Sequence, residues 1–142
     1  MAGVDRADAD HWESLFGINL ITALNMCRAV VPAMREARSG SIVNIGAVGA
    51  AKAGSGMGAY AAAKSAVQRL TESLADELKA SAVRVNCVLP STIDTPQNRA
   101  AMPKADPARW VTPGQVAAVI AFLLSEGASD VNGAAIPVVG RG

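Results

Sequence analysis

The residues best suited to acid–base chemistry are Tyr60, the single tyrosine of the 142-residue chain, and Lys64, four positions later. On a helix, residues at i and i+4 lie on one face, one turn apart. A lysine ammonium beside a phenol favours the phenolate, so this spacing predicts that Lys64 lowers the pKa of Tyr60 from its ordinary value of about 10. Such a phenol can act as a general acid or base. The pair alone also fits an amphipathic helix with a rim tyrosine and a solvated lysine.

The histidine and the two cysteines of the chain have no neighbours in the sequence that would form a metal site with them. His11 is the single histidine and stands beside acidic residues in a predicted first helical turn, where we interpret it as a solvated surface group. Cys27 and Cys87 lie in apolar segments without Cys or His at metal-ligand spacing. We therefore expect no metal site and a reduced, cytoplasmic setting.

Hydrophobic periodicity predicts the elements that must position Tyr60 and Lys64. Residues 91–111, between the predicted strand 83–89 and the predicted helix 112–127, are polar and irregular. Because strands that alternate with helices form parallel sheets, we expect one α/β domain over 1–142, with a doubly wound sheet in a three-layer α/β/α arrangement. The predicted helices are 10–38, 59–80 and 112–127, and the predicted strands are 41–45, 83–89 and 134–139.

Local signals mark the ends of two of these helices. Asp10 and Glu13 have the spacing of a capping box at the start of the first helix, which we expect to be kinked near Pro32. Thr112 and Gln115 form a second predicted capping box, and a proline between them occupies the first helical position.

Two segments follow strands and therefore share one edge of the predicted sheet. Tyr60 begins a helix after the strand 41–45 and a glycine-rich loop, and the segment 90–95 follows the strand 83–89. Open α/β sheets bind ligands at the carboxyl ends of their strands. This placement favours a site at that edge.

The combination of Tyr-x-x-x-Lys, Asn-x-Val-x-Pro and Ile-x-Thr at these spacings resembles the short-chain dehydrogenase/reductase family. The resemblance extends from Asn19 to Val139. It implies the carboxyl-terminal part of a Rossmann fold that binds NADP or NAD, and hydride transfer to a small-molecule carbonyl or quinonoid imine.

The resemblance also implies roles for individual residues. Tyr60 matches the catalytic acid/base. Lys64 matches the lysine that lowers the tyrosine pKa and binds the nicotinamide ribose, and Asn19 matches the asparagine that holds a water of the proton relay. The segment whose backbone and hydroxyl hold the nicotinamide carboxamide and the phosphates corresponds to Pro90, Ile93 and Thr95.

The sequence departs from the family pattern where a catalytic serine is expected. That serine stands thirteen residues before the tyrosine, and here Ala47 occupies the position. This loss, together with the segment Leu-Pro-x-Thr-x-Asp-Thr-Pro-x-Asn-Arg that ends at Arg99, most resembles members close to quinonoid dihydropteridine reductase. An activated quinonoid imine needs less help from a serine. The alternative is that Ala47 marks a weakened enzyme.

A second departure concerns the cofactor. The family's glycine turn for the pyrophosphate and the residue that selects between NAD and NADP belong to an amino-terminal half that does not match any part of this chain. The glycine cluster 54–58 lies too far from the strand 41–45 for a tight strand-to-helix turn, and we interpret it as a substrate-side loop.

Composition excludes several other classes. The formal net charge of +1 argues against nucleic-acid binding, and 51% hydrophobic residues favour a packed core. We expect no membrane partner, because no apolar run in the sequence approaches the roughly 20 residues that a span needs.

Two hypotheses remain. The first is a reductase that transfers a hydride. The second is a catalytically incomplete half-domain that acts as an interaction or oligomerisation module. In this family the helices corresponding to 10–38 and 59–80 usually form a four-helix interface, so a homo-oligomer, dimer or tetramer, is expected in either case.

Overall fold

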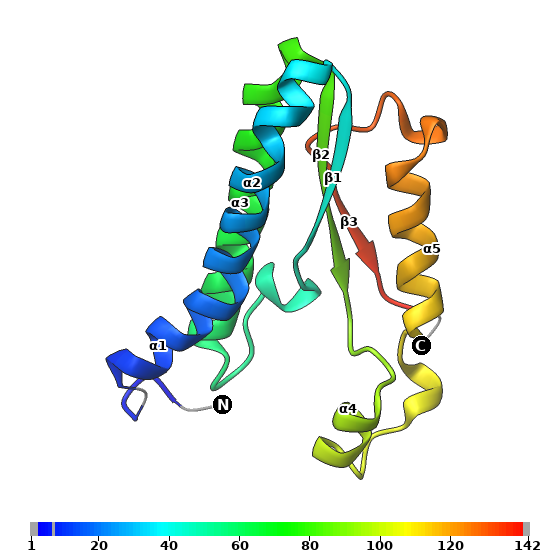
Figure 1. Cartoon of the computed structure of the whole chain (residues 1–142). Helices are drawn as coiled ribbons and strands as arrows, with labels where there is room; N and C mark the ends of the chain where they lie inside the picture. Colours follow the sequence, from blue (N-terminus) through cyan, green and yellow to red (C-terminus); the bar gives the residue numbers. More distant parts are fainter. Residues whose placement is uncertain (1–2, 7, 141–142) are drawn as a thin grey trace.

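The computed structural model describes residues 3–6 and 8–140 of the chain (Figure 1). Its sheet contains β1 (Gly40–Ile45), β2 (Val83–Pro90) and β3 (Ala135–Val138), all parallel, in the order β1-β2-β3. The α/β fold class, the parallel sheet and the three strands are therefore confirmed. The α-helices are α1 (Ala9–Phe16), α2 (Thr22–Ala37), α3 (Gly58–Leu78), α4 (Pro96–Ala101) and α5 (Pro113–Leu124).

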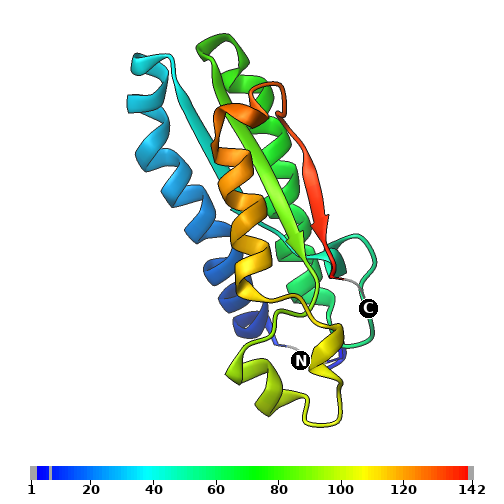
Figure 2. The ribbon, with the colours of Figure 1, turned by 90° about the vertical axis from the view of Figure 1, so that its right-hand side faces the viewer.

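Helices cover both faces of this sheet. Helices α2 and α3 run side by side on one face, and α5 covers the other (Figures 1 and 2). The middle strand β2 is buried on both faces, which explains its nearly unbroken apolar sequence. Its odd-numbered side chains, among them Val83, Val85 and Cys87, pack on the α2/α3 side, while Val88 packs against α5.

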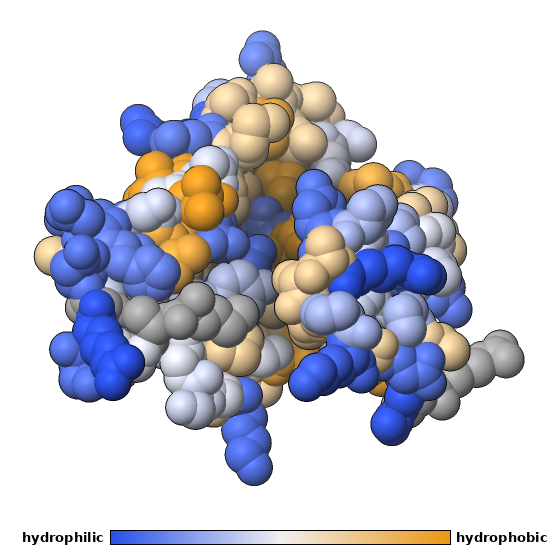
Figure 3. Space-filling view, turned by 90° about the horizontal axis from the view of Figure 1, so that it is seen from below, coloured by the Kyte–Doolittle hydropathy of each residue, from blue (hydrophilic) through white to orange (hydrophobic). Residues whose placement is uncertain are grey.

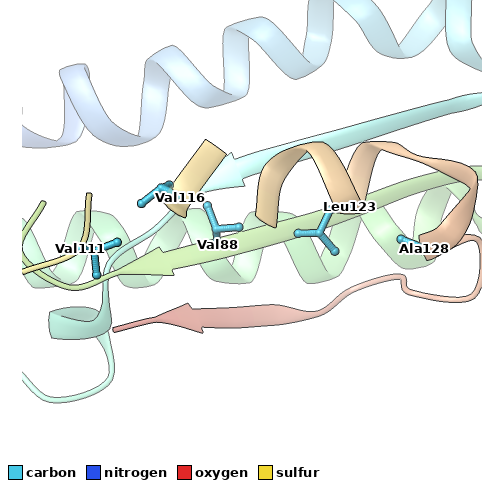
Figure 4. Packing of buried hydrophobic residues seen from close by; sticks show 5 residues of the cluster. All are labelled: Val88, Val111, Val116, Leu123 and Ala128. Atoms are coloured by element: carbon cyan, nitrogen blue, oxygen red, sulfur yellow. The ribbon is translucent and has the colours of Figure 1, made fainter. Parts of the chain in front are cut away.

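The core beneath α5 is built from few side chains. Val88 of β2 contacts a cluster contributed by α5 and the segments at its two ends (Figure 4). Leu123 is fully buried there, and burying such a side chain contributes roughly 1.5–3 kcal/mol. The cluster is completed by Val111, Val116 and Ala128.

Buried amides connect the strands to the loops and helices around them. Asn86, fully buried in β2, donates from Nδ2 to the Val131 carbonyl at 2.8 Å and accepts from the Ala134 N–H at 3.0 Å. Asn44 of β1 donates to the Thr71 hydroxyl of α3 at 2.9 Å. The first of the two asparagines therefore fixes the approach to β3.

The first long helix differs from its predicted form. It is capped by Asp8, whose carboxylate accepts from the His11 N–H at 2.9 Å, so the expected capping box of Asp10 and Glu13 is wrong. Between α1 and α2 the helix has a π-helical turn, η1 (Gly17–Ile21), which the sequence did not predict. Pro32 lies inside α2, which continues to Ala37.

The predicted irregular segment 91–111 contains short helices. Thr95 caps α4 by accepting from the Asn98 N–H at 3.2 Å, and Asp106 caps the 3-10 turn η4 (Pro107–Arg109). The capping box of Thr112 and Gln115 at the start of α5 is confirmed. The remaining 3-10 turns are η2 (Val48–Ala50), η3 (Lys79–Ser81) and η5 (Glu126–Ala128).

One helix meets the length and composition criteria for a membrane span. The continuous helix Ala9–Ala37 contains an 18-residue window of mean hydropathy 1.5, of which 6% is buried. The expectation that no segment would approach these criteria is therefore wrong. In the fold, however, α2 packs against β1 and α3, as a layer of an α/β protein does.

Candidate active site at the carboxyl edge of the sheet

Helix α3 starts at the carboxyl edge of the sheet and runs back along it. It begins at Gly58, so Tyr60 lies in its first turn and Lys64 one turn later. A methyl group added at Gly58 would lie 3.8 Å from the Trp12 ring, so α1 packs closely on this end of α3. Seen from the carboxyl ends of the strands, this face has a hollow between the α1 side and the α4 side, with apolar residues exposed in it (Figure 3).

Lys64 reaches the end of the neighbouring strand. Its Nζ donates to the Ile45 carbonyl at 2.9 Å, where β1 ends. Burial lowers the pKa of Lys64, and the neighbouring Cys87 opposes this effect. An ammonium has three donors, so two remain for other partners.

Tyr60 is half-buried on the same helix. Burial raises the pKa of its phenol above the ordinary value. The predicted lowering by Lys64 is therefore wrong for the chain as described, because burial is the one cause of the shift and disfavours the charged phenolate. Tyr60 is thus a protonated donor at neutral pH.

Asn19 lies in the π-helical turn η1, which packs against α3. Its Nδ2 donates to the Leu15 carbonyl at 2.9 Å, and the Thr22 hydroxyl donates to the Ile18 carbonyl at 2.8 Å. These two bonds satisfy carbonyls where the regular helical ladder is interrupted. The structure therefore brings Asn19 to the same side of the sheet as Tyr60, with its amide engaged in its own helix.

Ala47 stands where the ladder between β1 and β2 ends. The preceding Gly46 still donates to the Val88 carbonyl at 2.9 Å. A Cβ at Gly46 would lie 2.5 Å from Leu89 Cδ2, so only glycine permits this close approach. Ala47 itself is 8% exposed and offers a methyl group at this position.

The segment after β2 is held in place by backbone bonds. Pro90 pairs with Val138 at the end of the sheet, and the Ser91 N–H donates to the Val138 carbonyl at 3.0 Å. Ile93 forms an isolated parallel bridge with Val111. The three predicted cofactor-binding residues of this segment, Pro90, Ile93 and Thr95, therefore lie on one turn at the carboxyl edge.

Sequence reasoning missed the side chains that hold this turn. Arg99 donates to both carboxylate oxygens of Asp94, at 2.6 and 2.8 Å, and lowers the pKa of that carboxyl group. Asn98 donates from Nδ2 to the Ile93 carbonyl at 2.7 Å. The spacing of Thr95 and Asn98, a capping residue and the third residue of a short helix, was the available signal.

The described residues fit only one end of a dinucleotide. Lys64 and the turn 93–95 offer donors and acceptors at the ligand-binding edge. The glycine cluster 54–58 follows the 3-10 turn η2 and leads into α3, and it does not follow a strand directly. In residues 3–6 and 8–140, no strand leads through a glycine-rich turn straight into an α-helix, the arrangement that binds a pyrophosphate.

Comparison with known families and sequences gives a consistent result. The model of the family described as Enoyl-(Acyl carrier protein) reductase matches residues 2–140. The 3-oxoacyl-[acyl-carrier-protein] reductase FabG of Pseudomonas aeruginosa is 37% identical over an alignment of 146 residues that covers 95% of this chain and 58% of that protein. The rabbit (Oryctolagus cuniculus) dehydrogenase/reductase SDR family member 4 is 34% identical over 91% of this chain and 54% of its own length.

Solved structures show the same fold. A gluconate 5-dehydrogenase from Burkholderia cenocepacia, solved with NADP and tartrate, superposes with a TM-score of 0.91 at 30% identity and covers 98% of this chain and 58% of its own. A 3-oxoacyl-[acyl-carrier protein] reductase from Brucella melitensis with bound NAD gives a TM-score of 0.86 at 37% identity, over 97% of this chain and 54% of that one. The chain thus spans little more than half the length of the relatives it matches.

Proposed function

The chain belongs to the short-chain dehydrogenase/reductase family, and from this premise we propose that it forms the catalytic, nicotinamide-side part of an NAD(P)-dependent oxidoreductase. One observation carries the proposal. Tyr60 and Lys64 lie one turn apart at the carboxyl edge of the sheet, and the Lys64 ammonium contacts the end of β1.

In the proposed reaction Tyr60 is the acid/base. NADH or NADPH, when bound, supplies the hydride. The Tyr60 phenol donates its proton to the substrate oxygen or nitrogen, so that hydride and proton together reduce a C=O or C=N bond. In the chain as described burial keeps this phenol protonated, and the Lys64 ammonium is proposed to favour proton release when the site is occupied.

Lys64 has two proposed tasks. Its ammonium stabilises the phenolate that proton donation leaves behind, and its remaining donors bind the nicotinamide ribose hydroxyls. Asn19 is proposed to support a water of the proton relay from the π-helical turn. Pro90, Ile93 and Thr95 are proposed to hold the nicotinamide carboxamide and the nearby phosphate.

The proposed substrate is a small carbonyl compound or a quinonoid imine. Ala47 supports an activated substrate, because its methyl group cannot donate a hydrogen bond to a carbonyl oxygen. The named relatives include 3-oxoacyl-[acyl-carrier-protein] reductases and a gluconate 5-dehydrogenase, so the family accommodates different carbonyl substrates. The ligands of the solved relatives include NAD and NADP, and we propose one of these two cofactors for this chain.

Self-association is also proposed, as a dimer or tetramer through the helices α1, α2 and α3. The large apolar side chains of Ile18, Ile21 and Met26 are 63%, 44% and 66% exposed on the first long helix. Such residues favour a protein interface. They also support the second candidate, an interaction module without catalytic activity, which shares the cytoplasmic setting and needs neither nucleic acid nor membrane.

A chimera separates the two candidates. The part of Pseudomonas aeruginosa FabG that has no counterpart here is joined in front of this chain, and NADPH and NADH oxidation are followed with ketone and quinonoid pterin substrates. A reductase predicts turnover that Tyr60→Phe lowers at least 10²-fold while cofactor affinity changes little. Arg69→Gln, an exposed change on the same helix, is the control.

Either of two results would reject the catalytic proposal. One is a near-normal rate in the Tyr60→Phe chimera. The other is a folded chimera that binds the cofactor and reduces none of the substrates, which favours the interaction module.

A further inference from the structure

We propose that Asn98 is a positioning residue for the nicotinamide end of the cofactor. Its side chain and backbone contact both groups assigned to the carboxamide subsite: Nδ2 donates to the Ile93 carbonyl at 2.7 Å, and its N–H donates to the Thr95 hydroxyl at 3.2 Å. The inference rests on the proposed function, because it assumes that Ile93 and Thr95 hold the carboxamide.

The two bonds leave the right atoms for a ligand. A carbonyl oxygen has two lone pairs, so Ile93 retains one that can accept a carboxamide N–H. The Thr95 hydroxyl accepts from Asn98 and keeps its own O–H as a donor. A carboxamide offers an N–H donor and a C=O acceptor, which complement this pair.

The surrounding contacts make the arrangement rigid. Pro96 at the first position of α4 restricts Thr95 to extended backbone, as its ψ of 155° shows. The Asp94 N–H donates to the Val111 carbonyl at 2.7 Å. The bidentate ion pair of Asp94 and Arg99 closes the same turn.

Two bonds fix the Ile93–Asp94 peptide from its two sides. The Asp94 N–H donates to the Val111 carbonyl, and the Asn98 amide is the one side-chain donor to the Ile93 oxygen among the described residues. Because the peptide is planar, both bonds restrict the direction of the Ile93 carbonyl. Removing the amide leaves the peptide held from its N–H side only, so the direction of the carbonyl toward a carboxamide is less restricted.

The test uses the 142-residue chain and ligands that carry only the nicotinamide end. Reduced nicotinamide mononucleotide and its 3-acetylpyridine analogue are titrated into the chain, and dissociation constants are taken from the amide NMR shifts of residues 93–95. The analogue has a methyl ketone in place of the carboxamide and therefore lacks the N–H donor. The wild-type chain is expected to prefer the carboxamide ligand about fivefold, as one hydrogen bond predicts.

Asn98→Leu is expected to lower this preference from about fivefold to less than about twofold, because the carbonyl is then held from the N–H side of its peptide only. The neighbouring Gln97→Leu, an exposed change on the same turn, should keep it. A merely structural role for Asn98 would weaken both ligands alike and leave their ratio unchanged. If Asn98→Leu does not fold by circular dichroism, Asn98→Asp, which keeps the shape and loses the donor, takes its place.

A preference that stays at about fivefold without the Asn98 amide would overturn the proposal. A wild-type chain that binds the two ligands equally, or neither of them at residues 93–95, would also overturn it. These readouts are independent of hydride transfer, because the titrations contain no substrate, whereas the proposed function is tested by turnover of the chimera.

Discussion

At the scale of single residues, burial decides the electrostatics of the site. It raises the pKa of Tyr60 and lowers the pKa of Lys64, so in the chain as described both groups tend toward their neutral forms. A phenolate formed beside the ammonium would offset part of this desolvation for each group. In the proposed reaction the proton transfer and the charge of Lys64 are therefore coupled, and a bound cofactor that excludes further water would strengthen the coupling.

The methyl group of Ala47 makes a direct prediction for the substrate range. In the chimera, Ala47→Ser should introduce reduction of ordinary ketones at a modest rate, because the added hydroxyl can donate to a carbonyl oxygen at the end of β1. Reduction of a quinonoid pterin should change little. Initial rates on the two substrate classes test this, with Ala50→Ser, three residues along the same loop, as the matched control. Loss of activity on both classes would contradict an activated substrate.

The buried thiols make stability depend on alkaline pH. Burial raises the pKa of Cys27 and of Cys87 above the ordinary value of 9.0. The folded chain therefore holds thiol protons that the unfolded chain releases, so the contribution of these groups is complete below pH 9 and is lost as the pH rises above it. Lys64, with its lowered pKa, acts in the opposite direction.

Urea unfolding between pH 7 and 10.5 measures this effect. The free energy of unfolding of the wild-type chain should fall relative to that of Cys27→Ala/Cys87→Ala as the pH passes 9. Comparison with the double variant removes the contribution of Tyr60, which both proteins share, and leaves of the Lys64 contribution only the part that Cys87 causes. A pH-independent difference between the two proteins would show that the thiols are not titrated differently on folding.

At the scale of elements, the asparagine of the Asn-x-Val-x-Pro motif has a structural task. Asn86 joins the carbonyl of Val131 to the N–H of Ala134 and so shapes the turn that leads into β3. Asn132, in the same turn, accepts from the Val85 N–H and donates to the Ala75 carbonyl of α3. The motif thus fixes how β3 pairs with β2. It thereby shapes the carboxyl edge of the sheet, where β2 ends at Pro90.

Asn86→Leu tests this assignment. The substitution keeps the side-chain size and leaves a buried carbonyl and N–H without partners, so it should lower the free energy of unfolding by about 2–4 kcal/mol. Gln97→Leu, an exposed change in α4, should change the free energy of unfolding by less than about 0.5 kcal/mol. Chemical denaturation measures both. A loss below about 1 kcal/mol for Asn86→Leu would mean that water or another group satisfies these atoms.

Strong periodicity made most elements predictable. The strands were correct because β2 is a continuous apolar run between turn residues, and α3 because its apolar positions recur every three to four residues. The π-helical turn was not predicted, since it depends on the bonds of Asn19 and Thr22 to particular carbonyls. Helix α4 was missed because six residues with little apolar periodicity are stabilised by the Thr95 cap and by contacts within the turn.

The candidate site was predictable to the same depth. The sequence could single out Tyr60, Lys64, Ala47 and the turn 93–95 because their spacing is local, and their roles stay predictions. The bond of Asn98 to Ile93 was not predicted, because only the folded turn brings the two groups together. The direction of the Tyr60 pKa was wrong because burial cannot be read from the i, i+4 spacing.

At the scale of the whole molecule, the sheet is open at β1. Strand β1 is an edge of the three-stranded sheet, and Ile45 at its end is 41% exposed. On the sheet face that α5 covers, the side chains of Phe122 and Leu124 are 50% and 48% exposed. Exposed strand edges and exposed apolar side chains of this kind are surfaces on which other polypeptide segments can pack. The relatives, nearly twice as long, have additional sequence that can provide this cover.

This architecture predicts weak cofactor binding by the 142-residue chain alone. A dinucleotide is held chiefly by its pyrophosphate on a glycine turn at a helix N-terminus and by its adenine-side ribose. The described residues supply Lys64 and the turn 93–95, which are proposed to serve the nicotinamide end.

Several charge-assisted hydrogen bonds are therefore absent, each contributing roughly 1.5–3 kcal/mol, so affinity should fall by orders of magnitude relative to the chimera. Self-association cannot restore them, because each copy brings the same residues. Calorimetric titration of the purified, mass-verified chain with NADPH and NADH should give dissociation constants in the millimolar range or weaker, with the chimera as positive control. A micromolar constant for the chain alone would require a different mode of cofactor binding, built from residues other than a glycine turn.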